Sequence, residues 1–120
     1  MYFVVIAHHE QGRVKSGSDV QLAFADFLSS HPEHPDVVVH NAGPTHVDDV
    51  NIVDGFLLVV EASSIETVKA FIADCPYSKA GTLAQTHIRM WDWRTGKPGG
   101  WSTTKFSSNR DALVEKSNTI

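Results

Sequence analysis

The sequence predicts an α+β domain in which two helices cover one face of an antiparallel four-stranded sheet. Segments 2–8, 36–43 and 55–62 are rich in β-branched and aromatic residues, and segment 83–93 alternates between apolar and polar residues. Stretches with apolar residues at helical spacing follow the first and third of these strands. The order strand–helix–strand–strand–helix–strand is that of a ferredoxin-like, or split βαβ, arrangement.

The first predicted strand, "YFVVIAH", is followed by a polar, glycine-containing loop, "EQGRVKSGS". Ser18 or Asp19 can cap the first helix, because their side-chain oxygens accept the free amide hydrogens of a first turn. The apolar face of this helix consists of Val20, Phe24, Phe27 and Leu28. Two prolines in "SSHPEHP" then end the helix.

The second strand, "DVVVHNAG", is expected to end at Gly43-Pro44. The segment "PTHVDDVNIVD" is a polar connection without a period of its own. The third strand, "GFLLVVEA", is apolar at nearly every position, so we expect it to be central in the sheet and covered on at least one face.

Ser63 or Ser64 is expected to begin the second helix, whose apolar face contains Ile65, Val68, Phe71 and Ile72. Cys75 precedes Pro76 and is therefore disfavoured in the α region, which ends the helix. The segment "YSKAG" reads as a short helical turn closed by Gly81, and the last strand follows directly.

Both helices lie on one face of the predicted sheet, so a monomer leaves the other face bare. The strands are too apolar to be wetted there, and we therefore expect two sheets to pack face to face in a homodimer. Residues 1–93 form the predicted domain, and residues 94–120 form an extension rich in Gly, Ser, Thr and Lys. We expect this extension either to be loosely ordered or to lie across the partner subunit, with Trp101 and Phe106 as anchors.

Composition excludes several classes of protein. The chain has 120 residues and a net charge of −4, without a basic patch, so we expect no nucleic-acid partner. No apolar run is long enough to span a membrane, and the start lacks the basic region of a signal peptide, so we expect a cytoplasmic protein. Cys75 is the only cysteine, so neither an intrachain disulfide nor a four-cysteine zinc site can form.

Several segments resemble the YCII-related family. They are "YFVVIAH", "NAGP", "GFLLVVEASSIETVKAFIADCPYSKAG" and "THIRMWDW". The hallmark run of that family is a strand ending in Glu-Ala, a helix, an Asp-Pro-Tyr or Asp-Pro-Phe turn, a Gly and a strand ending near an aromatic residue. The resemblance covers residues 1–93 and implies a dimeric α/β-barrel. The Asp-Pro-Tyr turn contains one inserted residue here, Cys75, and we expect Tyr77 to pack under that corner.

The resemblance also implies an enzyme without an organic cofactor. Family members are expected to carry a His on the first helix and an Asp after the Gly-Pro, in a cleft between helices and sheet. One member type is a dehydrochlorinase acting on a chlorinated hydroxyquinol. An imidazole oriented by a carboxylate suits proton abstraction next to a carbonyl. In this chain Gln21 stands at the family His position, and an amide cannot act as a base.

Lyase or isomerase chemistry on a small polar or aromatic compound is therefore our first hypothesis. Asp48 or Asp49 would act as acid or base, aided by His8, His9 or His46. The competing interpretation places these histidines in solvent or at the dimer contact. A second hypothesis is a binding or accessory protein that has lost the chemistry with the family His.

A third hypothesis is a metal-dependent variant that uses His46 and Asp48, since imidazole and carboxylate suit divalent transition ions. The spacing of these residues matches no standard motif, so we assign no metal ligand.

The candidate ligand-binding residues are Gln21, Arg13, Arg89 and Trp91. Trp91 and Trp93 point the same way in an extended strand, as does Arg89, so they can form an aromatic wall with a cation beside it. Packing in the dimer interface is the alternative.

The other histidines are assigned structural roles. His31 and His34 are expected in a surface loop. His40 and His87 are expected in strands, facing either the core or the dimer interface, with a hydrogen-bonded interior ring as the default.

Overall fold

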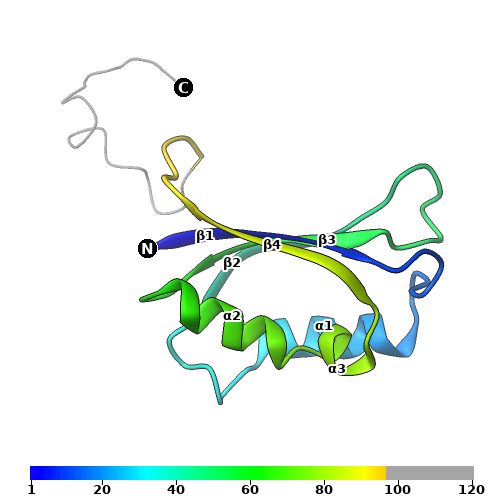
Figure 1. The fold of residues 1–120 in the computed structure, drawn as a ribbon, viewed down its shortest axis with the longest axis horizontal. Coiled ribbons are helices and arrows are strands. Elements are labelled where there is room, and N and C mark those ends of the chain that lie inside the picture. The colour runs from blue at the N-terminus through cyan, green and yellow to red at the C-terminus, as the bar shows by residue number, and fades with distance from the viewer. Residues whose placement is uncertain (97–120) are drawn as a thin grey trace.

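The computed structural model describes residues 1–96 of the chain, and its elements follow the predicted order (Figure 1). The elements are β1 (Tyr2–His9), α1 (Asp19–Ser29), β2 (Val38–Thr45), β3 (Gly55–Glu61), α2 (Ile65–Ala73), α3 (Pro76–Ala80) and β4 (Leu83–Trp91). The strands form one antiparallel sheet in the order β2-β3-β1-β4. This arrangement confirms the ferredoxin-like α+β fold and the central position of β3.

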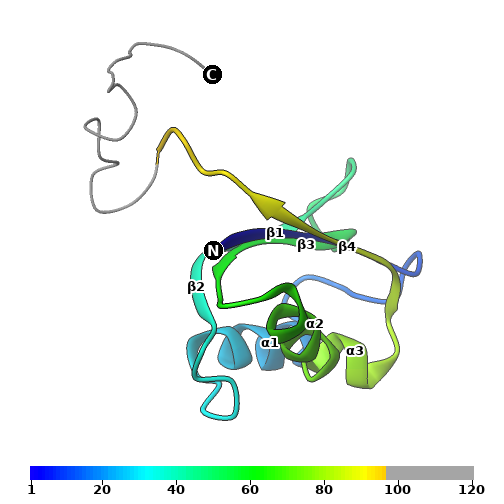
Figure 2. The ribbon, with the colours of Figure 1, turned by 60° about the vertical axis from the view of Figure 1, so that its left-hand side comes forward.

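All three helices lie on the same face of the sheet, as Figures 1 and 2 show from two directions. The core lies between these layers, where Phe3, Val5 and Ala7 of β1 are fully buried. Aromatic rings fill it: Phe24 of α1 contacts Phe56 of β3 at 4.7 Å between ring centroids. None of the helices in the described part of the chain is long and apolar enough to cross a membrane.

The opposite face of the sheet is covered by no element of residues 1–96 (Figures 1 and 2). Val4 pairs with Val59 there, and Ile6 pairs with Leu57. Ile6 and Leu57 are 37% and 39% exposed, whereas Val59 is only 6% exposed, so the outward-facing apolar residues of the two central strands meet solvent mainly at Ile6 and Leu57. The predicted bare apolar face is therefore present.

The turn between α2 and β4 forms as the sequence indicates. Ser64 caps α2 by accepting a hydrogen bond from the amide of Thr67 at 3.2 Å. Cys75 is extended and starts α3, and Gly81 ends that helix with a φ of 71°, in the left-handed region. Tyr77 is 2% exposed, so its ring packs under the corner as expected.

Three local expectations need correction. β2 continues through Gly43 and Pro44 to Thr45, because it is an edge strand and an edge tolerates a residue without an amide hydrogen. The Ser18 hydroxyl makes no capping bond; Gln21 Oε1 instead accepts a hydrogen bond from the Gly17 amide at 2.6 Å. β1 also includes His9, while β3 and β4 end at Glu61 and Trp91.

Gly55 is required by the close approach of β3 to β1. A Cβ atom at this position would collide with the carbonyl oxygen of Ala7. The residue pairs with His8, so this contact sets the spacing of the two strands at the end that carries both histidines.

Residues 97–120 lie outside the described part of the chain. Trp101, Phe106 and all of the 94–120 extension except residues 94–96 are among these residues, so the expectations for them stay predictions.

Candidate functional site

The candidate site lies where β1 ends. Because β1 is antiparallel to both neighbours, its end meets the beginnings of β3 and β4. His8 pairs with Gly55, and His9 pairs with Leu83. The sheet thus gathers His8, His9, Asp54 and Thr82 from three separate segments.

His9 is the buried member of this group, at 6% exposure. Its Nδ1 lies 3.0 Å from the hydroxyl oxygen of Thr82, and its ring packs edge-on against Tyr77 with centroids 4.3 Å apart. The other ring nitrogen, Nε2, is buried and has no hydrogen-bond partner within the described chain. Buried polar atoms are normally paired, so this nitrogen is a candidate for contact with a ligand.

The environment of His9 favours the neutral imidazole. Burial lowers the pKa of His9 below its ordinary value of 6.5, because a charged ring loses solvation. The negative charge of Asp54 opposes this shift in part, and His8 adds to it. A neutral ring carries a lone pair on one nitrogen, which is what a general base needs at neutral pH.

His8 points to the opposite side of β1 and forms a pair with Asp54. Its Nδ1 lies 3.2 Å from Asp54 Oδ2, and both side chains are partly exposed. The carbonyl of Asp54 also accepts the backbone amide of His9 at 2.8 Å. Asp54 therefore links the two histidines.

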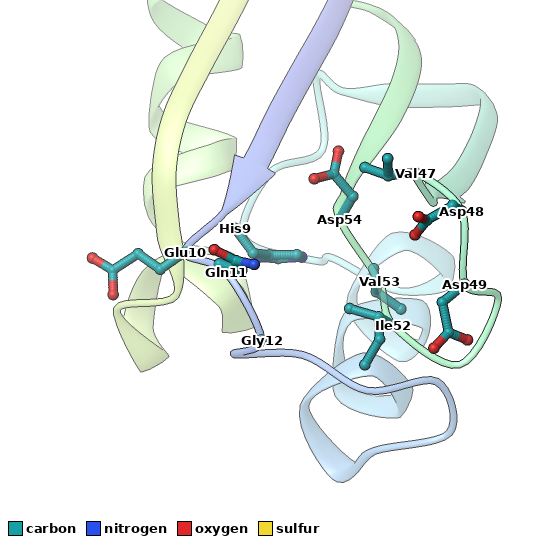
Figure 3. Close-up of a pocket in the computed structure, with 10 residues that line it drawn as sticks. All are labelled: His9, Glu10, Gln11, Gly12, Val47, Asp48, Asp49, Ile52, Val53 and Asp54. Atoms are coloured by element: carbon teal, nitrogen blue, oxygen red, sulfur yellow. The ribbon is translucent and has the colours of Figure 1, made fainter.

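A hollow of about 580 Å³ opens beside His9 (Figure 3). We call it the acidic hollow. Its lining residues are His9, Glu10, Gln11, Gly12, Val47, Asp48, Asp49, Ile52, Val53 and Asp54. Figure 3 shows Asp48 and Asp49 on the loop between β2 and β3, across from the end of β1, whereas Glu10 points away from them.

The structure brings His9 to the same hollow as Asp48 and Asp49, but no histidine of residues 1–96 is hydrogen-bonded to either carboxylate. Asp49 Oδ1 accepts the amide of Asn51 at 2.9 Å. His46 is exposed and donates from Nδ1 to the carbonyl of Ile52 at 2.7 Å. It supports the fold of the loop and is absent from the lining of the hollow.

A second hollow, of about 400 Å³, lies between α1 and β2; we call it the aromatic hollow. Its lining residues are Gln21, Leu22, Phe24, Ala25, Leu28, Ser29, Ala42, Gly43, Pro44, Phe56 and Tyr77. Gln21 thus lies in a cleft between helix and sheet. The rings of Phe56 and Tyr77 both contact His9, so this imidazole adjoins the walls of both hollows.

The other predicted binding residues lie elsewhere. Arg13 is exposed in the loop after β1 and pairs with Glu10 at 3.2 Å. Arg89 is exposed and donates to the carbonyl of Ile88. Trp91 stacks on Trp93 at 4.9 Å, and Arg89 and Trp91 occupy the uncovered face of the sheet. They do not meet the residues around His9.

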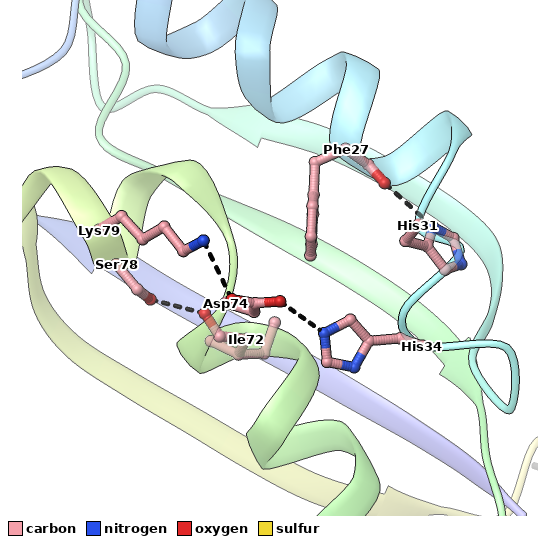
Figure 4. A network of polar contacts seen from close by, with 7 residues as sticks. All are labelled: Phe27, His31, His34, Ile72, Asp74, Ser78 and Lys79. Carbon is pink, nitrogen blue, oxygen red and sulfur yellow. Dashed lines mark hydrogen bonds and ion pairs between the residues drawn. The ribbon is translucent and has the colours of Figure 1, made fainter.

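The remaining histidines have partners or face solvent. His31 and His34 lie in the loop after α1, and His34 Nε2 is 2.9 Å from Asp74, which also pairs with Lys79 at 3.1 Å (Figure 4). His40 pairs with Glu61 at 2.9 Å, and His87 is exposed.

Metal binding has no support in the described chain. Within residues 1–96, no group of three or more His, Cys, Asp or Glu side chains is placed to hold a metal ion. His46 and Asp48 accordingly lack a third ligand there.

Sequence reasoning missed Asp54 and Thr82. Both directly precede a strand that pairs with β1, and Thr82 follows the glycine that ends α3. Strand order is the signal that could have found them, because in an antiparallel sheet the residue before one strand lies beside the end of its neighbour.

A solved structure with a TM-score above 0.5 agrees with the fold. The solved structure of a 5-chloro-2-hydroxyhydroquinone dehydrochlorinase, TftG from Burkholderia phenoliruptrix AC1100, in complex with 2,5-dihydroxybenzoquinone, is similar. It shares 24% identity over 77% of this chain and 94% of that chain, with a TM-score of 0.51. The Arabidopsis thaliana protein At3g17210 shares 13% identity over 80% and 97% of the two chains, with a TM-score of 0.46. No curated protein matches the sequence.

The family model of the YCII-related domain matches residues 1–92. This match spans almost all of the described chain, including β1, the turn at Tyr77 and β4. The chain therefore belongs to the YCII-related domain family.

Proposed function

We propose that this protein is a small enzyme that transfers a proton on a small polar or aromatic compound, with His9 as the base. One observation carries the proposal: a buried imidazole beside a hollow holds one ring nitrogen by a hydrogen bond and leaves the other without a partner. In the free chain Nε2 is covered, so ligand binding has to uncover it.

The reaction is a proton transfer next to a carbonyl. Nε2 accepts the proton from carbon, and the electron pair of the C–H bond moves into the carbonyl to form an enolate. In an isomerisation the proton returns to another carbon. In an elimination the electron pair expels a leaving group such as chloride, and the imidazolium later releases its proton to solvent.

Nearby carboxylates can stabilise the imidazolium of His9 and can bind the substrate. The negative charge of Asp54 favours the imidazolium that forms when His9 takes the proton. Asp48 and Asp49 line the hollow, where they can accept hydrogen bonds from substrate hydroxyl groups. They also remain the alternative proton acceptors.

A homodimer is part of this proposal. The apolar strip of Val4, Ile6, Leu57 and Val59 faces away from the helices. Packing this strip against the same strip of a second copy removes apolar area from water. This stabilises the dimer by about 25 cal/mol for each Å² of apolar area buried. Trp91 and Arg89 lie on the same face and would then belong to the interface.

The test compares two His→Gln variants. We expect 5-chloro-2-hydroxyhydroquinone and related phenols and quinones to include a compound that the wild-type protein turns over. His9→Gln should then lower turnover by about 10²–10⁴-fold, the usual contribution of general base catalysis. The matched control is His34→Gln, in the loop after α1, because His34 lines neither hollow and lies away from the uncovered face of the sheet. Equal turnover by His9→Gln and wild type would contradict the proposal.

A second candidate function is ligand binding without catalysis, in the aromatic hollow. Two observations favour it: the hollow is lined by aromatic and aliphatic side chains, and the Gln21 amide is engaged by the Gly17 backbone. Titration with 2,5-dihydroxybenzoquinone should then shift the NMR signals of Leu22 and Ala42, which line only the aromatic hollow, more than those of Asp48 and Asp49, which line only the acidic hollow. Binding abolished by Phe24→Ala, together with unaltered compound, would favour this function over the first.

A further inference from the structure

Thr82 is held beside His9 by backbone contacts on both sides. Its amide donates to the carbonyl of Tyr77 at 3.1 Å, and its carbonyl accepts the amide of Glu10 at 2.7 Å. The residue is 3% exposed and follows Gly81, whose left-handed conformation ends α3. The position of its hydroxyl is therefore fixed by the end of the turn between α2 and β4.

The Thr82 hydroxyl has two neighbours but only one proton to donate. Its oxygen lies 3.3 Å from the carbonyl oxygen of Tyr77 and 3.0 Å from His9 Nδ1. The carbonyl can only accept. If the hydroxyl donates to it, the hydroxyl lone pair is free to accept from a protonated Nδ1, and both contacts are hydrogen bonds.

The other tautomer of His9 makes fewer bonds. With Nδ1 bare, the hydroxyl must turn toward the ring and give up its bond to Tyr77. Nε2 has no partner in the described chain in either form, so it does not distinguish the two. The form with a bare Nδ1 is disfavoured because it loses the hydrogen bond from the Thr82 hydroxyl to the Tyr77 carbonyl.

We propose that Thr82 is the positioning residue of this site, holding His9 as the tautomer protonated at Nδ1 so that the lone pair is on Nε2. The relay consists of His9 Nδ1–H, the Thr82 hydroxyl and the Tyr77 carbonyl. Tyr77 contributes twice, since its ring also packs on the imidazole. The Asp-Cys-Pro-Tyr turn thus acts as the support of the base. The catalytic meaning of this relay rests on the proposed function, whereas the tautomer is a property of the ligand-free chain.

The test is a nitrogen–proton NMR experiment on ¹⁵N-labelled full-length protein at about pH 8, where the His9 ring is neutral. The His9 signals are assigned by their loss in His9→Gln. We expect the Nδ1–H form to exceed the Nε2–H form by about three- to tenfold, the effect of one net hydrogen bond. A majority of Nε2–H in the wild-type protein would overturn the proposal.

Two variants of Thr82 form the matched pair. Thr82→Val keeps the shape but removes the hydroxyl, and should abolish the preference for Nδ1–H. Thr82→Ser keeps the hydroxyl and should restore it. An unchanged tautomer ratio in Thr82→Val overturns the role of the hydroxyl; if that variant does not fold, the wild-type and Thr82→Ser spectra decide.

The outcome is separate from that of the proposed function, because no substrate is present in the NMR experiment. On a compound that the protein turns over, Thr82→Val should lower kcat about tenfold at constant KM, and Thr82→Ser should recover it. A shifted tautomer ratio with unchanged kcat would refute the positioning role. Equal turnover by His9→Gln would instead refute the base.

Discussion

His9 and His31 occupy opposite ends of the molecule and have opposite surroundings. His9 lies at the end of β1, and His31 lies in the loop between α1 and β2 (Figure 1). His9 has a hydroxyl on one nitrogen and nothing on the other. His31 has a carbonyl oxygen on each: Phe27 lies 3.0 Å from Nδ1, and Val37 lies 2.9 Å from Nε2.

This difference assigns the two rings to different roles. Both partners of His31 are backbone carbonyls, one in the last turn of α1 and one in the residue before β2. The ring thereby ties these two segments together. Figure 4 shows this ring beside the His34–Asp74–Lys79 cluster. His31 therefore closes a loop, whereas His9 keeps a nitrogen available.

The largest predicted effect removes the packing that supports His9. Tyr77→Ala should lower the free energy of unfolding by about 3–5 kcal/mol, because it leaves a cavity among His9, Phe24 and Phe56. Urea unfolding measures this loss. Tyr77→Phe retains the ring and should lose far less. Similar losses in the two variants would show that the ring itself does not support the site.

Removing the other ring tests the structural role of His31. His31→Ala should lower the free energy of unfolding by about 1–3 kcal/mol, since it deprives the carbonyls of Phe27 and Val37 of their donor. The exposed Glu33 in the same loop provides the control, and Glu33→Ala should change stability by less than about 0.5 kcal/mol. If thermal unfolding shows that His31→Ala costs no more stability than the control variant, the carbonyls of Phe27 and Val37 are satisfied by water instead.

The pH dependence of stability isolates His9. Its pKa is lowered in the folded chain by burial, so below about pH 6.5 the unfolded chain binds a proton that the folded chain resists. The resulting stability is fully present above that pH and is lost as the pH falls. Urea unfolding between about pH 7.5 and 5.5 should show this decrease in the wild type and a flatter profile in His9→Phe. Parallel profiles would contradict a buried neutral ring.

The smallest predicted effect concerns the cluster beside His31. Hydrogen bonds from His34 and then Lys79 lower the pKa of Asp74. Their contribution is present above the ordinary pKa of 3.8 and is lost as the pH falls through the lowered value. Asp74→Asn should therefore be less stable than wild type near neutral pH and approach it in strong acid, as thermal unfolding can show. Asp92→Asn, at an exposed ion pair, is the control.

Local rules predicted the elements well where the signal is local. Ser64, Cys75 and Gly81 begin or end helices where capping and proline geometry place them. Pro44 was misjudged because tolerance of proline depends on whether the strand is an edge, and strand order is not a local property. Ser18 was expected to cap through its hydroxyl, but the Gln21 side chain bonds the neighbouring amide of Gly17 instead.

The candidate site was predicted in part. His9, Asp48 and Asp49 do line one hollow, but His46 supports a loop, and Arg89 and Trp91 lie on the uncovered face. "YFVVIAHH" is apolar on both faces of β1, so no alternation tells which histidine faces the helices.

The sequence alone was enough to predict the order of strands and helices, the apolar residues on both faces of the central strands and the turn that carries Tyr77. These follow from periodicity, proline and glycine, which act over a few residues. Only the tertiary structure decided that His9 is buried with a free nitrogen and that Thr82 and Asp54 are its neighbours. The reason is that these contacts join chain segments through sheet pairing and burial, and a residue's solvation and hydrogen-bond partners exist only once those segments have packed.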